Sequence, residues 1–305
     1  MNVSERNLVH CLSFDVEEHF QVSAFESQAR RNQWGQCESR VRKNTDKILE
    51  LLASQQVRAT FFVLGWVAER YPVLVRSISA AGHEVASHGY GHELITSQTP
   101  AAFRDDIRKA KIILEDILGR RIYGYRAPSF SITRSTVWAL PILVEEGYVY
   151  DSSVFPIVHD RYGMPEAQPV CHELETAVGP LWEVPPSTIS MLGLRVPVAG
   201  GGYFRLFPYG ILKNCLRRIE QMGQPLVMYL HPWEFDATQP RMEGPLLSRF
   251  RHYVNLDKTE GRLIRLLRDF RFAPICEAIK PVAEICREHI ASLPAHPSCE
   301  VPQGA

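Results

Sequence analysis

Short apolar stretches alternate with amphipathic helical patterns along most of this chain, and this order limits its fold more than any other feature. The alternation runs from residues 8–15 to residues 272–275 of a 305-residue sequence. Strands that alternate with helices pair in parallel and place the helices on the faces of the sheet. We therefore predict an α/β fold, a distorted (β/α) barrel of about seven parallel strands. Strand patterns within residues 181–194 predict a small β-rich insertion.

The domain organisation follows from the same pattern. The sequence contains no internal repeat and no clear linker between domains. We predict that residues 1–277 form the barrel domain and that residues 278–305 form a C-terminal helix with a flexible, proline-rich tail. The polar residues 16–39 are expected to form a loop folded over the mouth of a site.

Charge, hydropathy and cysteine content exclude several classes of protein. Basic and acidic residues are equal in number, 34 of each, so the formal net charge of zero gives no electrostatic case for nucleic acid binding. No window approaches the roughly eighteen consecutive apolar residues of a membrane span, and the N-terminus lacks the apolar core of a signal peptide. Seven scattered cysteines without a Cys-x-x-Cys motif are typical of reduced thiols. We therefore expect a soluble, cytoplasmic protein.

Polar side chains stand at the carboxyl ends of the predicted strands. In a parallel barrel these ends form one rim, and sites are built on that rim. Each residue by itself has a structural alternative: a helix cap or turn for an aspartate, a surface ion pair for the arginine, a buried hydrogen bond for a histidine. Their position at strand ends as a group favours a functional site that contains Asp15, His88, Arg126, Asp151 and His231.

A metal site is the first candidate within this group. His88 and His92 lie four residues apart in a stretch with two glycines, so a compact loop can place both imidazoles on one ion. No glutamate follows His88, which excludes the zinc-protease pattern His-Glu-x-x-His. The pair alone is also compatible with a surface loop. The acidic cluster Asp15-Val16-Glu17-Glu18 supports the metal interpretation, because two imidazoles with one carboxylate are a typical catalytic zinc set.

The other members of the group suit acid–base chemistry around such an ion. A second carboxylate near the metal can take a proton from water, and His231 can give a proton to a leaving group. Arg126 would hold the base carboxylate. Asp151 would orient His231 and support its protonated form.

These residues resemble the polysaccharide deacetylases of carbohydrate esterase family 4, the nodulation-factor deacetylase homology group. Their first motif, Thr-Phe-Asp-Asp-Gly, is similar to Ser13-Phe14-Asp15-Val16-Glu17. By this resemblance Asp15 is the catalytic base. The family's metal-binding second aspartate is replaced by Val16, which cannot bind a metal. A branch of the family with Asp-x-Asp makes Glu17 the ligand, with Glu18 as the alternative.

Four further motifs follow in the family's order, so that the resemblance covers roughly residues 8–232. The histidine motif matches His88 and His92 as metal ligands, with glycine in place of the usual Ser or Thr after the first histidine. The Arg-x-Pro motif matches Arg126-Ala127-Pro128, and in the family this arginine contacts the catalytic base. Asp151-Ser152-Ser153 is similar to the fourth motif. Leu230-His231 is similar to the fifth and makes His231 the general acid.

Three later stretches resemble a bacterial subgroup that accompanies exosortase-linked exopolysaccharide operons. They are Trp182–Thr188, Gly200–Arg205 and His231–Asp236. The three consecutive glycines permit a close backbone approach, and a plain turn explains them equally well. Aromatic packing is likewise an alternative for the tryptophan of the third stretch. The residues expected to line a sugar groove are Pro128, Phe130, Gly201, Arg205 and Trp233.

The resemblance implies a metal-dependent hydrolase that removes N-acetyl groups from amino sugars of a bacterial polysaccharide or its precursor. The ion, zinc by expectation, would be held by Glu17, His88 and His92. Asp15 would take a proton from the attacking water, and His231 would give one to the departing amine. The expected partners are the saccharide substrate and proteins of exopolysaccharide synthesis.

Two other functions are compatible with the sequence. The first is an allantoinase-like hydrolase of cyclic amides on the same scaffold, which the acid two residues after Asp15 favours. The second is a non-catalytic polysaccharide-binding protein, against which the complete set of base and acid residues argues. An O-deacetylating esterase is a close variant that the motifs do not separate from an N-deacetylase.

Overall fold

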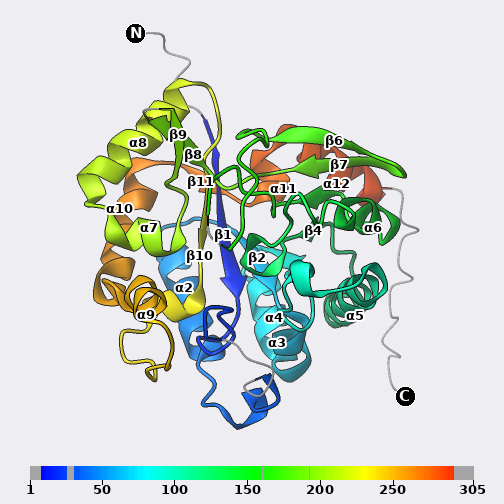
Figure 1. Cartoon of the computed structure of the whole chain (residues 1–305), viewed down its shortest axis with the longest axis horizontal. Coiled ribbons are helices and arrows are strands. Elements are labelled where there is room, and N and C mark those ends of the chain that lie inside the picture. The colour runs from blue at the N-terminus through cyan, green and yellow to red at the C-terminus, as the bar shows by residue number, and fades with distance from the viewer. Residues whose placement is uncertain (1–7, 26–30, 160, 192, 292–305) are drawn as a thin grey trace, which may run out of the picture.

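The computed structural model describes residues 8–25, 31–159, 161–191 and 193–291. A mostly parallel sheet lies at its centre, with the strand order β10-β1-β2-β3-β4-β5-β7-β6 and with β11 beside β1 (Figure 1). The α/β fold class is therefore confirmed. The strands that pair in parallel are β1 (His10–Val16), β2 (Thr60–Val63), β3 (Glu84–Ser87), β4 (Gly124–Tyr125), β5 (Tyr150–Asp151), β7 (Gly179–Glu183), β10 (Val227–Leu230) and β11 (Phe272–Ala273).

The predicted barrel is strongly distorted, and its named strands form an open path. On the outer side of β10, residues 187–200 supply backbone hydrogen bonds instead of a regular strand. Ser187 N donates to Val227 O at 3.2 Å, and Tyr229 N donates to Ala199 O at 2.8 Å. Gly200 forms an isolated bridge to Tyr229 there, and a Cβ at Gly200 would lie 1.7 Å from the Tyr229 carbonyl oxygen. Close approach of two backbones explains this glycine.

The predicted β-rich insertion is present and contains more strands than the sequence indicated. β6 (His172–Thr176) pairs antiparallel with β7 at the edge of the main sheet. β8 (Thr188–Met191) and β9 (Leu194–Pro197) form a separate two-stranded sheet. This insertion separates β7 from β10 in the sequence, and it brings the chain back towards β10.

Helices surround the sheet (Figure 1). Their ends follow sequence signals in several places: Thr99 Oγ1 accepts from Ala102 N at the start of α5, and Gly119 takes the left-handed conformation at its end. The α-helices are α2 (Val41–Ser54), α3 (Gly65–Arg70), α4 (Pro72–Ala80), α5 (Pro100–Leu118), α6 (Ala139–Glu145), α7 (Gly201–Leu206), α8 (Tyr209–Gln221), α9 (Leu246–Tyr253), α10 (Thr259–Asp269), α11 (Ile275–Ala278) and α12 (Lys280–Ala291).

The predicted C-terminal helix is present as α12, which packs against the sheet. Val282 and Cys286 of α12 join a buried cluster with Phe62 of β2 and Tyr150 of β5. The proposed boundary at residue 277 stays a prediction, and the predicted tail from residue 292 lies outside the described residues. Among the helices that the structure describes, none is both long enough and apolar enough to cross a membrane.

Candidate active site

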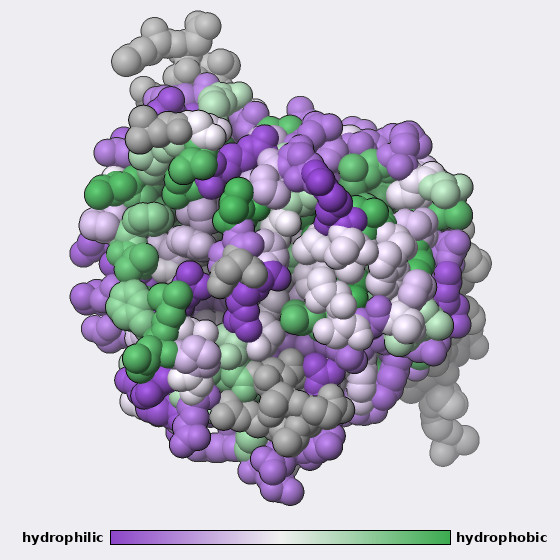
Figure 2. Space-filling model, viewed as in Figure 1, coloured by the Kyte–Doolittle hydropathy of each residue, from purple (hydrophilic) through white to green (hydrophobic). Residues whose placement is uncertain are grey.

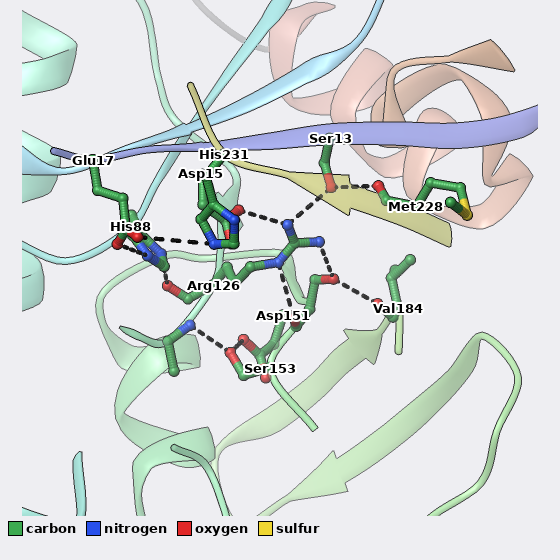
Figure 3. Close-up of polar contacts among 12 residues, drawn as sticks. Ser13, Asp15, Glu17, His88, Arg126, Asp151, Ser153, Val184, Met228 and His231 are labelled. Carbon is green, nitrogen blue, oxygen red and sulfur yellow. Dashed lines mark hydrogen bonds and ion pairs between the residues drawn. The ribbon is translucent and has the colours of Figure 1, made fainter. Parts of the chain in front are cut away.

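The parallel strands bring the predicted polar residues to one edge of the sheet (Figure 3). Asp15 is the last but one residue of β1, and Asp151 ends β5. His88, Arg126 and His231 each follow directly after the last residue of β3, β4 and β10. All five are buried except His231, whose side chain is 16% exposed. The expectation that these strand ends form one rim is therefore confirmed.

Glu17, His88 and His92 form a buried group with the donor set of a metal site. Their ligand atoms all lie within 4.8 Å of one another. Glu17 Oε2 lies 2.6 Å from His92 Nε2 and 3.8 Å from His88 Nε2. His92 has a positive φ of 50°, a conformation uncommon outside glycine, so the loop is turned sharply to bring the second imidazole inward.

The surroundings of this group fit a cation. His88 Nδ1 lies 2.8 Å from the Arg126 carbonyl oxygen, so Nδ1 carries the proton and leaves the Nε2 lone pair facing Glu17. Trp233 Nε1 donates to Glu17 Oε1 at 3.1 Å. The other oxygen, Oε2, is buried and accepts no hydrogen bond from the described residues. A carboxylate oxygen between two imidazole nitrogens matches the His₂Glu sets that bind zinc.

Electrostatics keep the Glu17 carboxyl ionised. Burial by itself favours the neutral acid, but the charge of His92 and the close imidazoles of His88 and His92 outweigh it. They hold the pKa of Glu17 well below its usual range. An anionic oxygen is therefore ready for a metal at neutral pH.

Glu18 has a different function from its neighbour. Its carboxylate accepts hydrogen bonds from the backbone N–H groups of Arg40 at 3.0 Å and Val41 at 3.2 Å, and from the hydroxyl of Ser39. These groups form the first turn of α2, where a negative charge also meets the positive end of the helix dipole. These contacts favour Glu17 over Glu18 as the metal-ligand candidate.

Asp15 is paired with Arg126, as the sequence analysis expected. Arg126 Nη1 donates to Asp15 Oδ1 at 2.7 Å and to Ser13 Oγ at 2.9 Å (Figure 3). Its other nitrogens donate to the carbonyl and hydroxyl oxygens of Ser152, and its guanidinium lies 4.0 Å from the ring centroid of Phe62. One Asp15 oxygen is thus fixed by the arginine, and the other faces the site.

His231 is oriented by Glu234, and the expected role of Asp151 in this contact is wrong. His231 Nδ1 lies 2.8 Å from Glu234 Oε1, which also accepts from the His231 backbone N–H. Glu234 Oε2 in turn accepts from Arg205 Nε at 2.6 Å. His231 Nε2 then lies 3.8 Å from an oxygen of both Asp15 and Glu17.

The charges around His231 favour its protonated form. Burial alone lowers the pKa of the imidazole, but the hydrogen bond to Glu234 and the charges of Glu17, Glu234 and Asp15 outweigh burial. Together they raise the pKa of His231 to about 9. Arg205 keeps the supporting acid ionised, because its charge lowers the pKa of the buried Glu234 carboxyl against the effect of burial.

Asp151 instead belongs to a buried acidic pair. It accepts a hydrogen bond from the Ser153 hydroxyl and neighbours Glu183, its register partner on β7. Burial raises the pKa of Asp151 to about 6. Burial and the charge of Asp151 raise the pKa of Glu183 well above its usual range. The physical reason for the corrected role is position, because β5 lies between β4 and β7 while His231 follows β10.

A cavity of about 400 Å³ opens above these groups. Of the expected groove residues, Phe130, Gly201, Arg205 and Trp233 line it, whereas Pro128 does not and its neighbour Ser129 does. The lining also includes Val22, Ser23 and Ala24, from the segment predicted to cover the mouth; residues 26–30 of that segment lie outside the described residues.

Two of the expected groove residues also support other site residues. Beyond Glu234, Arg205 donates through Nη1 to His252 O at 2.9 Å and to Val254 O at 2.6 Å, and through Nη2 to Arg251 O at 3.1 Å. Trp233 bonds Glu17 and stacks on His231 at 4.9 Å between ring centroids. Both side chains therefore hold catalytic candidates in place.

Sequence reasoning missed Glu234, although a local signal for it exists. Proline directly after His231 is typical of the first position of a helix. A glutamate three residues after the cap then returns to the cap's N–H, as in a capping box. The short helix η5 (Pro232–Phe235) has this pattern, with both reciprocal bonds formed.

Comparisons with known proteins show what parts of the chain are similar to. Residues 34–143 match the family model described as polysaccharide deacetylase. The chain is 32% identical over 108 residues to a peptidoglycan deacetylase-like protein of Gibberella zeae, over 35% of this chain and 31% of that protein. It is 38% identical over 86 residues to a peptidoglycan-N-acetylglucosamine deacetylase of Bacillus cereus, over 28% and 29% of the two chains. Part of the chain is therefore similar to polysaccharide deacetylases. The matched segment spans about a third of the length of these curated relatives.

Structural comparisons agree on the fold of this family. A protein assigned as a polysaccharide deacetylase from Mycobacterium smegmatis superposes with a TM-score of 0.61 at 21% identity, over 99% of this chain and 97% of that chain. One from Pseudomonas aeruginosa PAO1 gives 0.60 at 17%, over 94% and 93%. An allantoinase gives 0.59 at 16%, over 97% and 94%. At these identities the likeness concerns the fold, and it does not separate deacetylases from allantoinases.

The candidate site combines residues from two matched segments with Asp15 and Glu17, which precede both segments. The segment that matches the polysaccharide deacetylase model supplies His88, His92 and Arg126. Residues 152–280 match a domain of unknown function, DUF3473, and they supply His231, Glu234 and the arginine that pairs with it. The support for the general-acid candidate therefore comes from the part of the chain whose family description names no function.

Proposed function

We propose that this protein is a metal-dependent hydrolase that removes N-acetyl groups from amino sugars of a bacterial polysaccharide or its precursor. One observation carries the proposal. A buried His₂Glu group lies beside an arginine-bound aspartate and a carboxylate-supported histidine at the base of one cavity. This combination supplies a metal site, a base and an acid within reach of one small substrate group.

Glu17, His88 and His92 would hold the ion, for which zinc is proposed from the donor set. When bound, a divalent ion there supplies Lewis acidity for an acyl oxygen and for water. Glu17 directly follows β1, and both histidines follow β3, so the fold brings the two parts of the site together.

Side chains of the protein would carry out the proton transfers. Arg126 binds one oxygen of Asp15, which leaves the other oxygen of Asp15 to accept a proton from water. In its protonated form His231 carries a proton on each ring nitrogen: Nδ1–H donates to Glu234, and Nε2–H faces Asp15 and Glu17. The departing amine can take that proton.

The substrate class rests on the relatives. Curated proteins similar to part of this chain include a peptidoglycan deacetylase of Helicobacter pylori and a chitooligosaccharide deacetylase of Rhizobium leguminosarum bv. trifolii. Both names describe deacetylation of a saccharide, and the name of the Bacillus cereus relative specifies N-acetylglucosamine. An exopolysaccharide substrate with its synthesis proteins, and a cytoplasmic location, are part of the proposal and stay predictions.

Acetate release from chitooligosaccharides tests the activity directly. The wild type is stripped of metal, reloaded with zinc and compared with Asp15→Asn, and allantoin and an O-acetylated xylan are run in parallel. We expect zinc-dependent acetate release from the N-acetylated oligomers that Asp15→Asn abolishes. Ureide hydrolysis would identify an allantoinase, and acetate from xylan alone would identify an esterase. Saccharide binding by the zinc-loaded protein without any turnover would leave only the binding-protein alternative.

A further inference from the structure

Helix α9 exposes an unusual amount of apolar side chain. Leu246 is 81% exposed, Leu247 57% and Phe250 54%, and Leu206 at the end of α7 adds a fourth exposed apolar residue. The end of α7 is tied to the end of α9, because Arg205 donates to the carbonyl oxygens of residues 251, 252 and 254. We call the surface made by Leu206, Leu246, Leu247, Arg249, Phe250 and Arg251 the α9 face.

The α9 face continues into the mouth of the candidate active site. Leu206, Leu247, Phe250 and Arg251 line the cavity as well as the surface. Figure 2 shows hydrophobic side chains gathered on the side of the molecule where Figure 1 places α7 and α9. Contiguous exposed apolar surface at a site entrance is typical of a contact surface for a partner. A partner bound to the α9 face would therefore also lie next to the cavity entrance.

The segment around α9 carries an excess of positive charge. Residues 241–256 contain three arginines and a single glutamate, a net charge of +2, and residues 245–256 contain no acid at all. Arg249 is exposed next to Phe250. A short helix with exposed leucine and phenylalanine flanked by arginines has the composition of an interfacial, membrane-binding helix. Its charge complements an anionic surface.

We propose that the α9 face docks on an anionic lipid bilayer surface. Leu246, Leu247 and Phe250 would enter the headgroup region, while Arg249 and Arg251 contact lipid phosphates. A second copy of the chain fits less well, because a two-fold contact would bring two net-positive faces together. Docking needs no membrane span, and it does not depend on the chemistry of the site.

Docking would place the cavity mouth at the bilayer surface. Because Leu247 and Phe250 belong to both the α9 face and the cavity wall, a saccharide held at the membrane could enter without leaving it. This consequence, a membrane-attached amino-sugar substrate, rests on the proposed function. The docking proposal does not depend on the proposed function.

Vesicle co-sedimentation of the full chain tests the docking. The probes are vesicles of phosphatidylcholine alone and of phosphatidylcholine mixed with phosphatidylglycerol, at low and high salt. Leu246→Ser/Arg249→Gln removes one apolar residue and one charge from the α9 face, and neither residue lines the cavity. The matched control is Val73→Ser/Arg76→Gln on α4, an exposed pair with the same three-residue spacing.

We expect the wild type and the α4 control to bind the anionic vesicles, weakly in high salt and little to phosphatidylcholine alone. The α9 variant should bind at least about tenfold more weakly, since one arginine charge contributes about fivefold and an inserted leucine adds more. Equal binding by both variants, or no binding by the wild type, would overturn the docking. A wild-type dimer in sedimentation velocity that the α9 variant alone loses, without vesicle binding, would assign the face to self-association instead.

Acetate release from a soluble chitooligosaccharide separates this test from the proposed function. Both double variants should keep wild-type turnover, because all four residues lie outside the cavity. Vesicle binding without acetate release would contradict only the proposed activity. Acetate release without vesicle binding would contradict only the docking.

Discussion

Replacing Glu17 or Glu18 by alanine separates two adjacent acids that have the same chemistry and different surroundings. Glu17→Ala should remove the metal, because Glu17 supplies the only carboxylate of the His₂Glu group that the structure describes. Glu18→Ala should keep the metal and destabilise the fold. Its carboxylate holds two backbone N–H groups and one hydroxyl at the start of α2. His88→Ala serves as the reference for loss of a ligand.

The magnitude for Glu18→Ala follows from those contacts. A hydrogen bond to a charged group contributes about 1.5–3 kcal/mol, and the loss of a helix cap costs about 1 kcal/mol. Since the backbone groups of residues 40 and 41 share one carboxylate, we expect a loss of about 3 kcal/mol. For a domain of this size that corresponds to a fall in Tm of about 5 °C.

Two measurements on the same preparations test both effects: mass spectrometry gives the metal content, and calorimetry gives the Tm. The expected result is no bound ion in Glu17→Ala and His88→Ala, and wild-type metal content with a lower Tm in Glu18→Ala. Adding zinc should raise the Tm of the wild type and of Glu18→Ala only, because binding to the folded state stabilises it. Metal lost from Glu18→Ala and retained by Glu17→Ala would refute the assignment of the ligand.

Three further predictions concern the other site groups. Asp15→Asn should lower kcat about 10²–10⁴-fold with metal content unchanged, and near wild-type turnover would remove Asp15 from the role of base. Glu234→Gln should lower kcat with little change in KM and lower stability by about 3 kcal/mol, because Arg205 loses its buried counter-charge; Glu234→Asp should restore part of the kcat, and a change in KM alone would contradict the orienting role. Glu183→Gln should raise the Tm at about pH 8 and lose this advantage towards about pH 4. Burial raises the pKa of both Glu183 and Asp151, so the folded state binds protons more strongly than the unfolded state, and wild-type stability falls as the pH rises through that window. A Tm difference that is independent of pH would contradict this account.

Much of the site could be predicted from the sequence, because parallel strands align their carboxyl ends without further information. Asp15, His88, Arg126 and His231 stand at ends of strands that are readable as apolar runs. Residue type and order predicted the Asp15–Arg126 pair and a metal group of two histidines with a carboxylate, and the resemblance selected Glu17 as that carboxylate. The β-rich insertion and α12 were likewise readable, as local patterns.

Contacts between distant segments decided the rest. The start of α2 at Val41 is one example, because its backbone N–H donates to Glu18, more than twenty residues earlier in the chain. The stretch after Gly200 was interpreted as a turn or a close approach, and the structure shows both the approach to β10 and the helix α7. α9 was missed because its apolar residues face solvent and give no inner face to detect.

By itself, the sequence determined the fold class, the strand ends and the chemical types gathered there, since periodicity and residue identity are properties of short segments. Only the tertiary structure decided which acid serves which partner. Glu17 meets the histidines while Glu18 caps a helix, and Glu234 supports His231 while Asp151 pairs with Glu183. Carboxylates are chemically alike along a chain. Their roles differ because packing sets the distance from each one to its cations, donors and solvent.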